Sequence, residues 1–183
     1  MTSFYNEKEL SELGLKKYGA NVLISKKCSI YSPQKISIGG NVRIDDFCIL
    51  SGEITLGSYI HIAAYCALFG AFSIEMEDYT GLSPRCTVFS ATDNFSGDYL
   101  ISPMAEKSTT NVMGGKVLIK KYSQVGANCI LFPCITLGEG VAVGAMSLIN
   151  KNLEEWGIYA GIPAKKIKDR KKGLLNFVQI DEK

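Results

Sequence analysis

A six-residue spacing of aliphatic side chains runs through most of this 183-residue chain. It slips by two residues before Met76, is interrupted after Val88 and resumes at Ile119. The spaced positions are Ile38, Ile44, Leu50, Leu56, Ile62, Leu68, Met76, Leu82, Val88, Ile119, Val125, Leu131, Leu137, Val143 and Ile149. Neither an α-helix nor an alternating strand has a period of six. A chain that turns a corner every six residues does, so the spacing predicts a three-sided coil whose parallel strands stack about 4.8 Å apart.

A second set of positions, four residues after the aliphatic ones, carries small or β-branched side chains. These are Val42, Cys48, Ile54, Ile60, Cys66, Thr80, Cys86, Ser123, Cys129, Ile135, Val141 and Ser147. The four cysteines among them recur at the same place in successive coils, and Ser147 takes that place later. We interpret them as a ladder of buried free thiols at one inner corner. A zinc site is disfavoured because the chain has no CxxC motif and one histidine, and disulfides are disfavoured because no secretory signal is recognisable.

The length and the pattern predict one domain over residues 1–183. Residues 1–20 are expected to form an N-terminal helical segment, with an amphipathic helix over 3–17. Residues 21–162 are expected to form the coil, and residues 163–183 a basic C-terminal helix and tail that begin near Pro163. Within the coil, residues 91–116 lack the six-residue pattern and predict an extended loop, which at this length is either functional or disordered.

Composition excludes several classes of protein. Hydrophobic residues make up 46% of the chain and charged residues 21%, which is typical of a globular domain. The net charge of +2 gives no reason to expect a nucleic-acid partner. The apolar run over 62–72 is too short to span a bilayer, and the polar N-terminus is unlike a secretory signal. We therefore expect a cytoplasmic protein that is not inserted in a membrane.

The repeat, together with the closing stretch GIYAGIPAKKIKDR, resembles the hexapeptide-repeat acyltransferases. Within this family the chain is most similar to galactoside acetyltransferase and the bacterial sugar acetyltransferases, over about residues 24–170. The resemblance implies a mainly β fold, the left-handed parallel β-helix. It also implies a homotrimer, acetyl-CoA as cosubstrate between neighbouring coils, and a sugar acceptor. No metal is expected.

The resemblance also implies which residues hold acetyl-CoA. QVGAN and VGAM match coil segments where small residues let the pantetheine arm lie against the backbone. INKN matches a Thr-Lys pair of the family, and PAKKIK matches basic residues that meet the nucleotide phosphates. The implied positions are Gly126, Ala127, Gly144, Ala145, Asn150, Lys151, Lys165 and Lys168. Gln124 stands where many relatives have an aromatic residue. Without the family, the small pairs are equally typical of tight turns and the lysines of a solvated helix face.

Acyl transfer to a hydroxyl or amine needs a general base, and histidine is best matched at neutral pH. His61 is the only histidine, and strand alternation points it outward because it precedes the inward Ile62. Asp93 stands where the family has its catalytic histidine, at the start of the long loop. We hypothesise that His61 is the base and that Asp93 orients it or holds the acceptor, the two meeting across a groove between subunits. Asn94 and Tyr99 are expected to contact the sugar. Alternatively, His61 is a surface histidine and Asp93 a turn residue.

Three functions remain open at this point. The first is transfer of an acetyl group from acetyl-CoA to a hydroxyl or amine of a surface-polysaccharide or nucleotide-linked sugar. The second is acyl transfer to an acceptor that is not a sugar, on the same fold. The third is a non-catalytic β-helix that serves as a binding protein or scaffold, because a fold does not by itself determine function.

Overall fold

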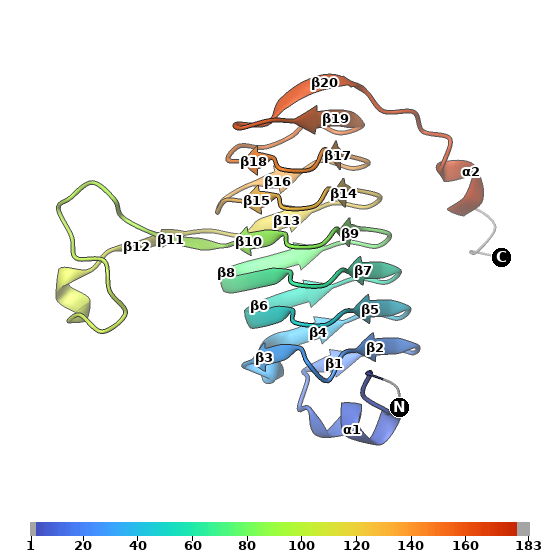
Figure 1. The fold of residues 1–183 in the computed structure, drawn as a ribbon, viewed down its shortest axis with the longest axis horizontal. Helices are drawn as coiled ribbons and strands as arrows, with labels where there is room; N and C mark the ends of the chain where they lie inside the picture. The colour runs from blue at the N-terminus through green and yellow to red at the C-terminus, as the bar shows by residue number, and fades with distance from the viewer. Residues whose placement is uncertain (1–2, 179–183) are drawn as a thin grey trace.

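The computed structural model describes residues 3–178 and shows a three-sided, left-handed parallel β-helix (Figure 1). Successive coils stack along one axis from the N-terminal end to the C-terminal end. The coil that the six-residue spacing predicts is confirmed. All of the spaced aliphatic residues are at most 5% exposed, because each points into the shared interior.

One side of the coil, here called face one, is a separate sheet of eight strands. Its strands are β2 (Val22–Ile24), β5 (Val42–Ile44), β7 (Ile60–Ile62), β9 (Gly81–Leu82), β14 (Gln124–Val125), β17 (Ala142–Val143), β19 (Gly157–Ala160) and β20 (Lys165–Asp169). All pairs are parallel except β19 with β20, which is antiparallel. Face one carries the candidate site described below.

The other two sides form one sheet, because β6 (Ile49–Leu56) and β8 (Ala67–Met76) bend around a corner and belong to both. Face two contains β3 (Ser29–Tyr31), the first halves of β6 and β8, β10 (Thr87–Phe89), β15 (Ile130–Leu131) and β18 (Leu148–Ile149). Face three contains β1 (Lys17–Tyr18), β4 (Ile36–Ile38), the second halves of β6 and β8, β13 (Val117–Ile119) and β16 (Thr136–Leu137). A short 3-10 helix, η1 (Pro33–Lys35), precedes β4.

The predicted ladder of small residues lies at the corner between faces one and two and is confirmed. Its cysteines are buried, and all six cysteines of the chain are free thiols. Each ladder thiol donates to a backbone carbonyl of the next coil, as Cys48 does to Ala63 O at 3.2 Å and Cys66 to Ser83 O at 3.1 Å. The thiol is therefore both a small apolar filler and a weak donor that links two coils.

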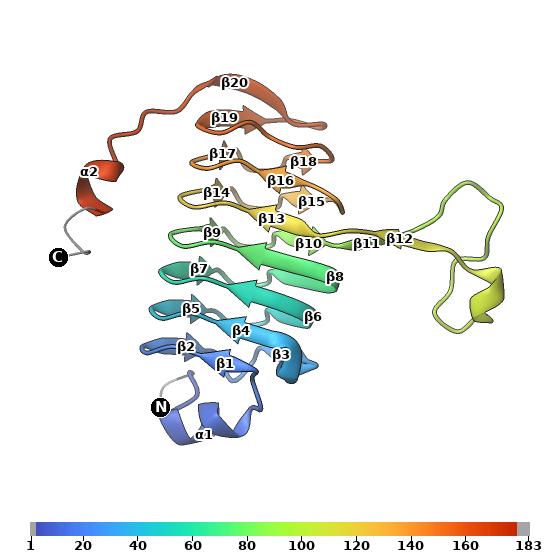
Figure 2. The ribbon, with the colours of Figure 1, turned by 180° about the vertical axis from the view of Figure 1, so that it is seen from behind.

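The long loop forms an arm that projects from the coil between β10 and β13 (Figures 1 and 2). Its base is an antiparallel pair, β11 (Ala91–Asp93) with β12 (Val112–Gly114), and its tip holds the 3-10 helix η2 (Lys107–Thr109). The predicted protruding loop over 91–116 is confirmed. Because the interruption falls at a corner, the coil continues on the far side without losing register.

The N-terminal helix is shorter than predicted. Helix α1 covers only Glu7–Glu12, with Asn6 as its N-cap, and Leu10 buries its apolar side against the first coil. Residues 17 and 18, which include the end of the predicted helix, form β1 because they pair in parallel with β4.

The prediction of a C-terminal helix that begins near Pro163 is wrong. Residues 165–169 form β20, and helix α2 covers only Leu175–Val178. The edge strand β19 offers a row of backbone hydrogen-bond groups, and pairing with it overrides the local preference of the lysine-rich segment. Arg170 then crosses a corner of the coil and donates to Tyr122 O at 2.8 Å and to Gly140 O at 3.0 Å. The predicted tail beyond residue 178 lies outside the described residues.

No helix within residues 3–178 is long and apolar enough to cross a lipid bilayer.

Candidate active site

A cavity of about 350 Å³ opens on face one, lined by His61, Ser83 and Gln124 among others. The strand register explains why it is there. His61 stands opposite Gly81 on the next strand, and Gly81 stands opposite Gln124 on the one after. Because Gly81 has no side chain, the side chain of Gln124 can lie over it. A Cβ atom at Gly81 would lie 2.5 Å from Oε1 of Gln124, whose Nε2 is held by the carbonyl oxygen of Tyr79 at 3.1 Å.

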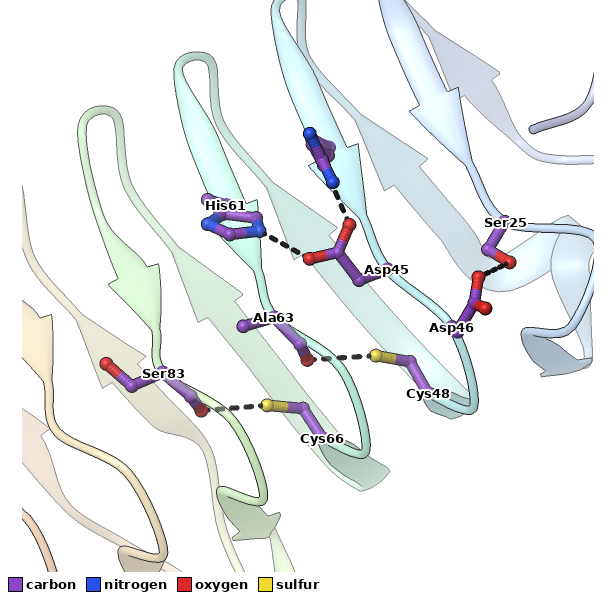
Figure 3. A network of polar contacts seen from close by, with 9 residues as sticks. Ser25, Asp45, Asp46, Cys48, His61, Ala63, Cys66 and Ser83 are labelled. Atoms are coloured by element: carbon purple, nitrogen blue, oxygen red, sulfur yellow. Dashed lines mark hydrogen bonds and ion pairs between the residues drawn. The ribbon is translucent and has the colours of Figure 1, made fainter. Parts of the chain in front are cut away.

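His61 points outward, as predicted, and hydrogen-bonds a carboxylate that the sequence analysis missed (Figure 3). Its Nε2 lies 2.8 Å from Oδ2 of Asp45, while Nε of Arg43 donates to Oδ1 of the same carboxylate at 2.7 Å. Burial raises the pKa of the Asp45 carboxyl, but the hydrogen bonds from Arg43 and His61 lower it by more, so its pKa lies below the ordinary value. Asp45 is therefore ionised at neutral pH.

Ser83 is a second residue of this cavity that the sequence analysis missed. Asp45, Ala63 and Ser83 each directly follow an inward aliphatic residue, so they occupy equivalent places in three consecutive coils (Figure 3). His61 belongs to the middle coil of the three. The signal was present in the repeat, because every third inward residue is followed by a position at this same corner of the coil, as Ile44, Ile62 and Leu82 are.

Asp93 lies at the base of the arm, on β11, and lines a different cavity of about 450 Å³. Three of its seven lining residues are aromatic: Phe89, Phe95 and Phe132. Asn94 follows Asp93, and its side-chain oxygen accepts from the backbone N–H of Ser96 at 2.8 Å. Within one chain the structure therefore does not bring Asp93 and His61 together.

Tyr99, the second residue expected to contact the sugar, lies farther along the arm and is exposed.

The small residues of the cofactor prediction lie together at the corner that follows face one. Gly126 and Ala127 follow β14, and Gly144 and Ala145 follow β17 in the next coil. A Cβ atom at Gly126 would lie 2.6 Å from the backbone nitrogen of Ala145, so close stacking of the two turns accounts for this glycine.

The polar members of the cofactor prediction lie at the C-terminal end of the coil. Asn150 and Lys151 follow β18, at the corner between faces two and three. Lys165 and Lys168 are exposed on β20, and Lys168 stands opposite Ile158. The structure thus places the small residues and the basic residues in two separate groups.

A continuous row of outward positions joins the cavity to Lys168. Gly81 pairs with Gln124, then Ala142, then Ile158 and then Lys168. Four strand spacings of about 4.8 Å span about 19 Å. Among residues 3–178 no group of three or more His, Cys, Asp or Glu side chains is arranged to hold a metal ion.

Comparison with known proteins gives relatives over the whole chain. A dTDP-4-amino-4,6-dideoxy-D-glucose acyltransferase from Escherichia coli is 39% identical over 181 residues, which cover 97% of this chain and 94% of that protein. A serine variant of AntD, an N-acyltransferase from Bacillus cereus, was crystallised with dTDP-4-amino-4,6-dideoxyglucose and coenzyme A. It is 51% identical, covers 100% of this chain and 98% of its own, and has a TM-score of 0.97.

AntD has also been crystallised with dTDP and 3-hydroxybutyryl-CoA, and that structure superposes with a TM-score of 0.96. No family model matches the chain.

Proposed function

Because this chain belongs to the left-handed β-helix sugar acyltransferases, we propose that it transfers an acyl group from a coenzyme A thioester to the 4-amino group of dTDP-4-amino-4,6-dideoxyglucose. The observation that carries the proposal is the 51% identity, over the full chain, to an enzyme crystallised with that sugar nucleotide and coenzyme A. The acyl group is acetyl, as the resemblance implies, or 3-hydroxybutyryl, as in the AntD complex.

Residue spacing in AntD supports Asp93 as a site residue and adds Ser83. AntD was crystallised as variants of a serine and of an aspartate that are ten positions apart. In this chain Ser83 and Asp93 are the only serine and aspartate with that spacing in that order. Ser83 lines the face-one cavity and Asp93 the cavity at the base of the arm.

The reaction forms one C–N bond and breaks one C–S bond. The sugar amine attacks the thioester carbonyl carbon, the coenzyme A sulfur leaves as a thiolate, and the proton lost by the amine ends on that sulfur to give the free thiol. In the proposed mechanism the Asp93 carboxylate accepts a hydrogen bond from the amine and orients it. The Ser83 hydroxyl donates to the carbonyl oxygen as negative charge develops on it, and His61 takes the proton from the amine nitrogen.

We further propose that a homotrimer completes this site. His61 and Ser83 of one subunit then face Asp93 of its neighbour, with Asn94 and Tyr99 beside the sugar. Two observations support this arrangement. In one chain the two cavities lie on different parts of the coil, and the arm carries apolar side chains that are largely exposed, such as Phe95 at 75% and Met104 at 91%.

The row of outward positions on face one supports a path for the cofactor. In this proposal the thioester lies in the cavity near Ser83, and the pantetheine arm runs along the row beside the corner that carries Gly126, Ala127, Gly144 and Ala145. The phosphates meet Lys165 and Lys168.

Asn150 and Lys151 lie at the same end of the coil as these lysines, because Ala164 N donates to Leu148 O at 2.8 Å. We include both residues in the binding site for the nucleotide phosphates.

The test is an assay of thiol release with the purified protein. Acetyl-CoA and 3-hydroxybutyryl-CoA are each offered with dTDP-4-amino-4,6-dideoxyglucose, and dTDP-glucose, which has a hydroxyl in place of the amine, is the matched control. We expect thiol release and an amide product with the amino sugar only. Equal turnover of dTDP-glucose would show O-acylation, and turnover of neither acceptor would contradict the proposal.

Mixing two inactive variants tests the shared site. Ser83→Ala and Asp93→Asn each lower kcat/KM by roughly 100-fold or more, because each removes a group that contacts the reacting atoms. In co-assembled trimers an interface is intact when one subunit supplies Ser83 and its neighbour Asp93, which holds for about one quarter of interfaces at equal mixing. Recovery of activity is therefore expected, and its absence would place the two residues in the site of one subunit.

A further inference from the structure

We infer that Asp45 is a positioning residue that holds the His61 imidazole in the tautomer with its proton on Nε2. This inference rests on the proposed function, in which His61 takes a proton from the acceptor. It names a residue that the sequence analysis did not assign to the site. Asp45 would act through His61 and not by contact with either substrate.

The contacts around the carboxylate fix its orientation. Oδ1 accepts from Nε of Arg43 at 2.7 Å, and Oδ2 lies 2.8 Å from Nε2 of His61. The side chain of Asp45 is 18% exposed, whereas those of Arg43 and His61 are 56% and 54% exposed. Each carboxylate oxygen thus has its own partner, which fixes the rotation of the carboxylate. Oδ2 is therefore held at a fixed place as the acceptor that faces His61.

An ionised carboxylate only accepts hydrogen bonds, so the nitrogen that faces it must carry the proton. In neutral His61 that nitrogen is Nε2, and the lone pair then lies on Nδ1. On the side of His61 opposite to Arg43, the register places Gly81. No side chain of that strand therefore stands between the imidazole and the amide of Gln124, which lies over Gly81.

The groups that surround His61 are of two kinds. On one side lie the charged Arg43 and Asp45, from β5 and the turn after it. On the other side the cavity wall is uncharged, with the hydroxyl of Ser83 and the amide of Gln124. Of these groups, the carboxylate is the one that hydrogen-bonds the ring in this structure, and its negative charge stabilises the imidazolium once the proton has been taken.

The chain supplies a matched control in the adjacent residue. Asp46 belongs to the same turn and also carries a charge, but it hydrogen-bonds Ser25 and pairs with Lys27 at 2.8 Å. Asp46→Asn therefore removes the same charge from the same turn and leaves the carboxylate at His61 in place.

The first measurement reads the tautomer directly. His61 is the only histidine in the chain, so the ring nitrogen signals in a ¹⁵N NMR spectrum belong to it without assignment. At a pH where the ring is neutral, we expect the proton on Nε2 in the wild type and in Asp46→Asn. In Asp45→Asn the side-chain amide can donate to the ring, so we expect the proton to be found partly on Nδ1. Unchanged nitrogen shifts in Asp45→Asn would overturn the inference.

The second measurement is a comparison of kcat with KM in the acyl-transfer assay. A general base contributes roughly 10²- to 10⁴-fold to the rate, so disordering it in Asp45→Asn is expected to lower kcat about 10- to 100-fold. KM for both substrates stays within about two-fold, because Asp45 touches neither. We expect Asp45→Glu, which has a carboxylate at this position, to recover part of the lost kcat. We expect Asp46→Asn to have the kcat of the wild type.

These outcomes separate the inference from the function on which it rests. A wild type that transfers no acyl group contradicts the proposed function, while the NMR comparison still tests the Asp45–His61 pair. An active wild type with an equally active Asp45→Asn variant contradicts the inference alone. Circular dichroism of each variant establishes that it is folded before its rate is compared.

Discussion

At the scale of single residues, the interior of the coil is built from a few side-chain types repeated at fixed places. The ladder cysteines are an example, because a thiol is small enough for a tight corner and still links coils by a weak hydrogen bond. This placement was predictable because position in the repeat determines burial. The hydrogen-bond partner of His61 was not predictable. Its contact with Asp45 joins two coils and depends on the directions of two outward side chains.

Thiol accessibility follows from this placement. Five cysteines are buried and Cys134 is exposed, and burial raises the pKa of the Cys28 thiol to about 12. We expect Ellman's reagent to modify one thiol per native chain and all six in guanidinium chloride. Cys134→Ser should then show none in the native state. Rapid modification of several native thiols would contradict the buried ladder.

The carboxylate beside His61 also contributes to stability in a pH-dependent way. Burial raises the pKa of Asp45, but the hydrogen bonds from Arg43 and His61 lower it by more. The pKa of Asp45 in the folded protein therefore lies below its ordinary value. A lowered folded-state pKa stabilises the protein above the unfolded-state pKa, and that contribution is lost as the pH falls through the folded-state pKa. Thermal unfolding between about pH 5 and 2 should therefore show a smaller loss of stability in Asp45→Asn than in the wild type. The same dependence of the melting temperature on pH in both proteins would contradict this contribution of Asp45.

At the scale of elements, the sequence pattern predicted the arm correctly and the C-terminal strand incorrectly. The arm was predictable because its residues break a strong repeat, so their departure from the coil is visible in the sequence. Strand β20 was not, because its lysines and Pro163 are equally compatible with a helix start. Its conformation is decided by the open edge of β19, which is a property of the assembled coil.

Replacing the arm tip tests whether the arm is needed for acyl transfer but not for the stability of the fold. Residues 95–111 can be exchanged for a short Gly-Asn turn that rejoins β11 and β12. We expect the melting temperature to stay within about 3 °C, because the tip contributes nothing to the buried core. Acyl transfer should fall at least about 100-fold, because Phe95 lines the Asp93 cavity. A collapse in stability would show that the arm supports the fold.

At the scale of the whole molecule, the six-residue repeat determines how one chain folds. It does not determine how chains associate, because the outward side chains that form contacts between chains are not part of the repeat. The proposed homotrimer would have a mass of about 60 kDa, three times the 20.0 kDa of the chain. Sedimentation equilibrium measures this mass. The arm-tip replacement should shift it toward the single chain if the exposed apolar residues of the arm form the contact. A single-chain mass for the wild type would contradict the shared site.

Strand β20 has one more consequence. A parallel stack has two open ends, and here α1 covers one while the antiparallel strand β20 covers the last strand of face one (Figure 1). Because an uncovered edge is a template for another strand, a chain cut before Pro163 should associate with a second copy of itself through the exposed edge of β19. Light scattering would record that association, and the pairing of β20 with β19 thus protects the intact chain from it.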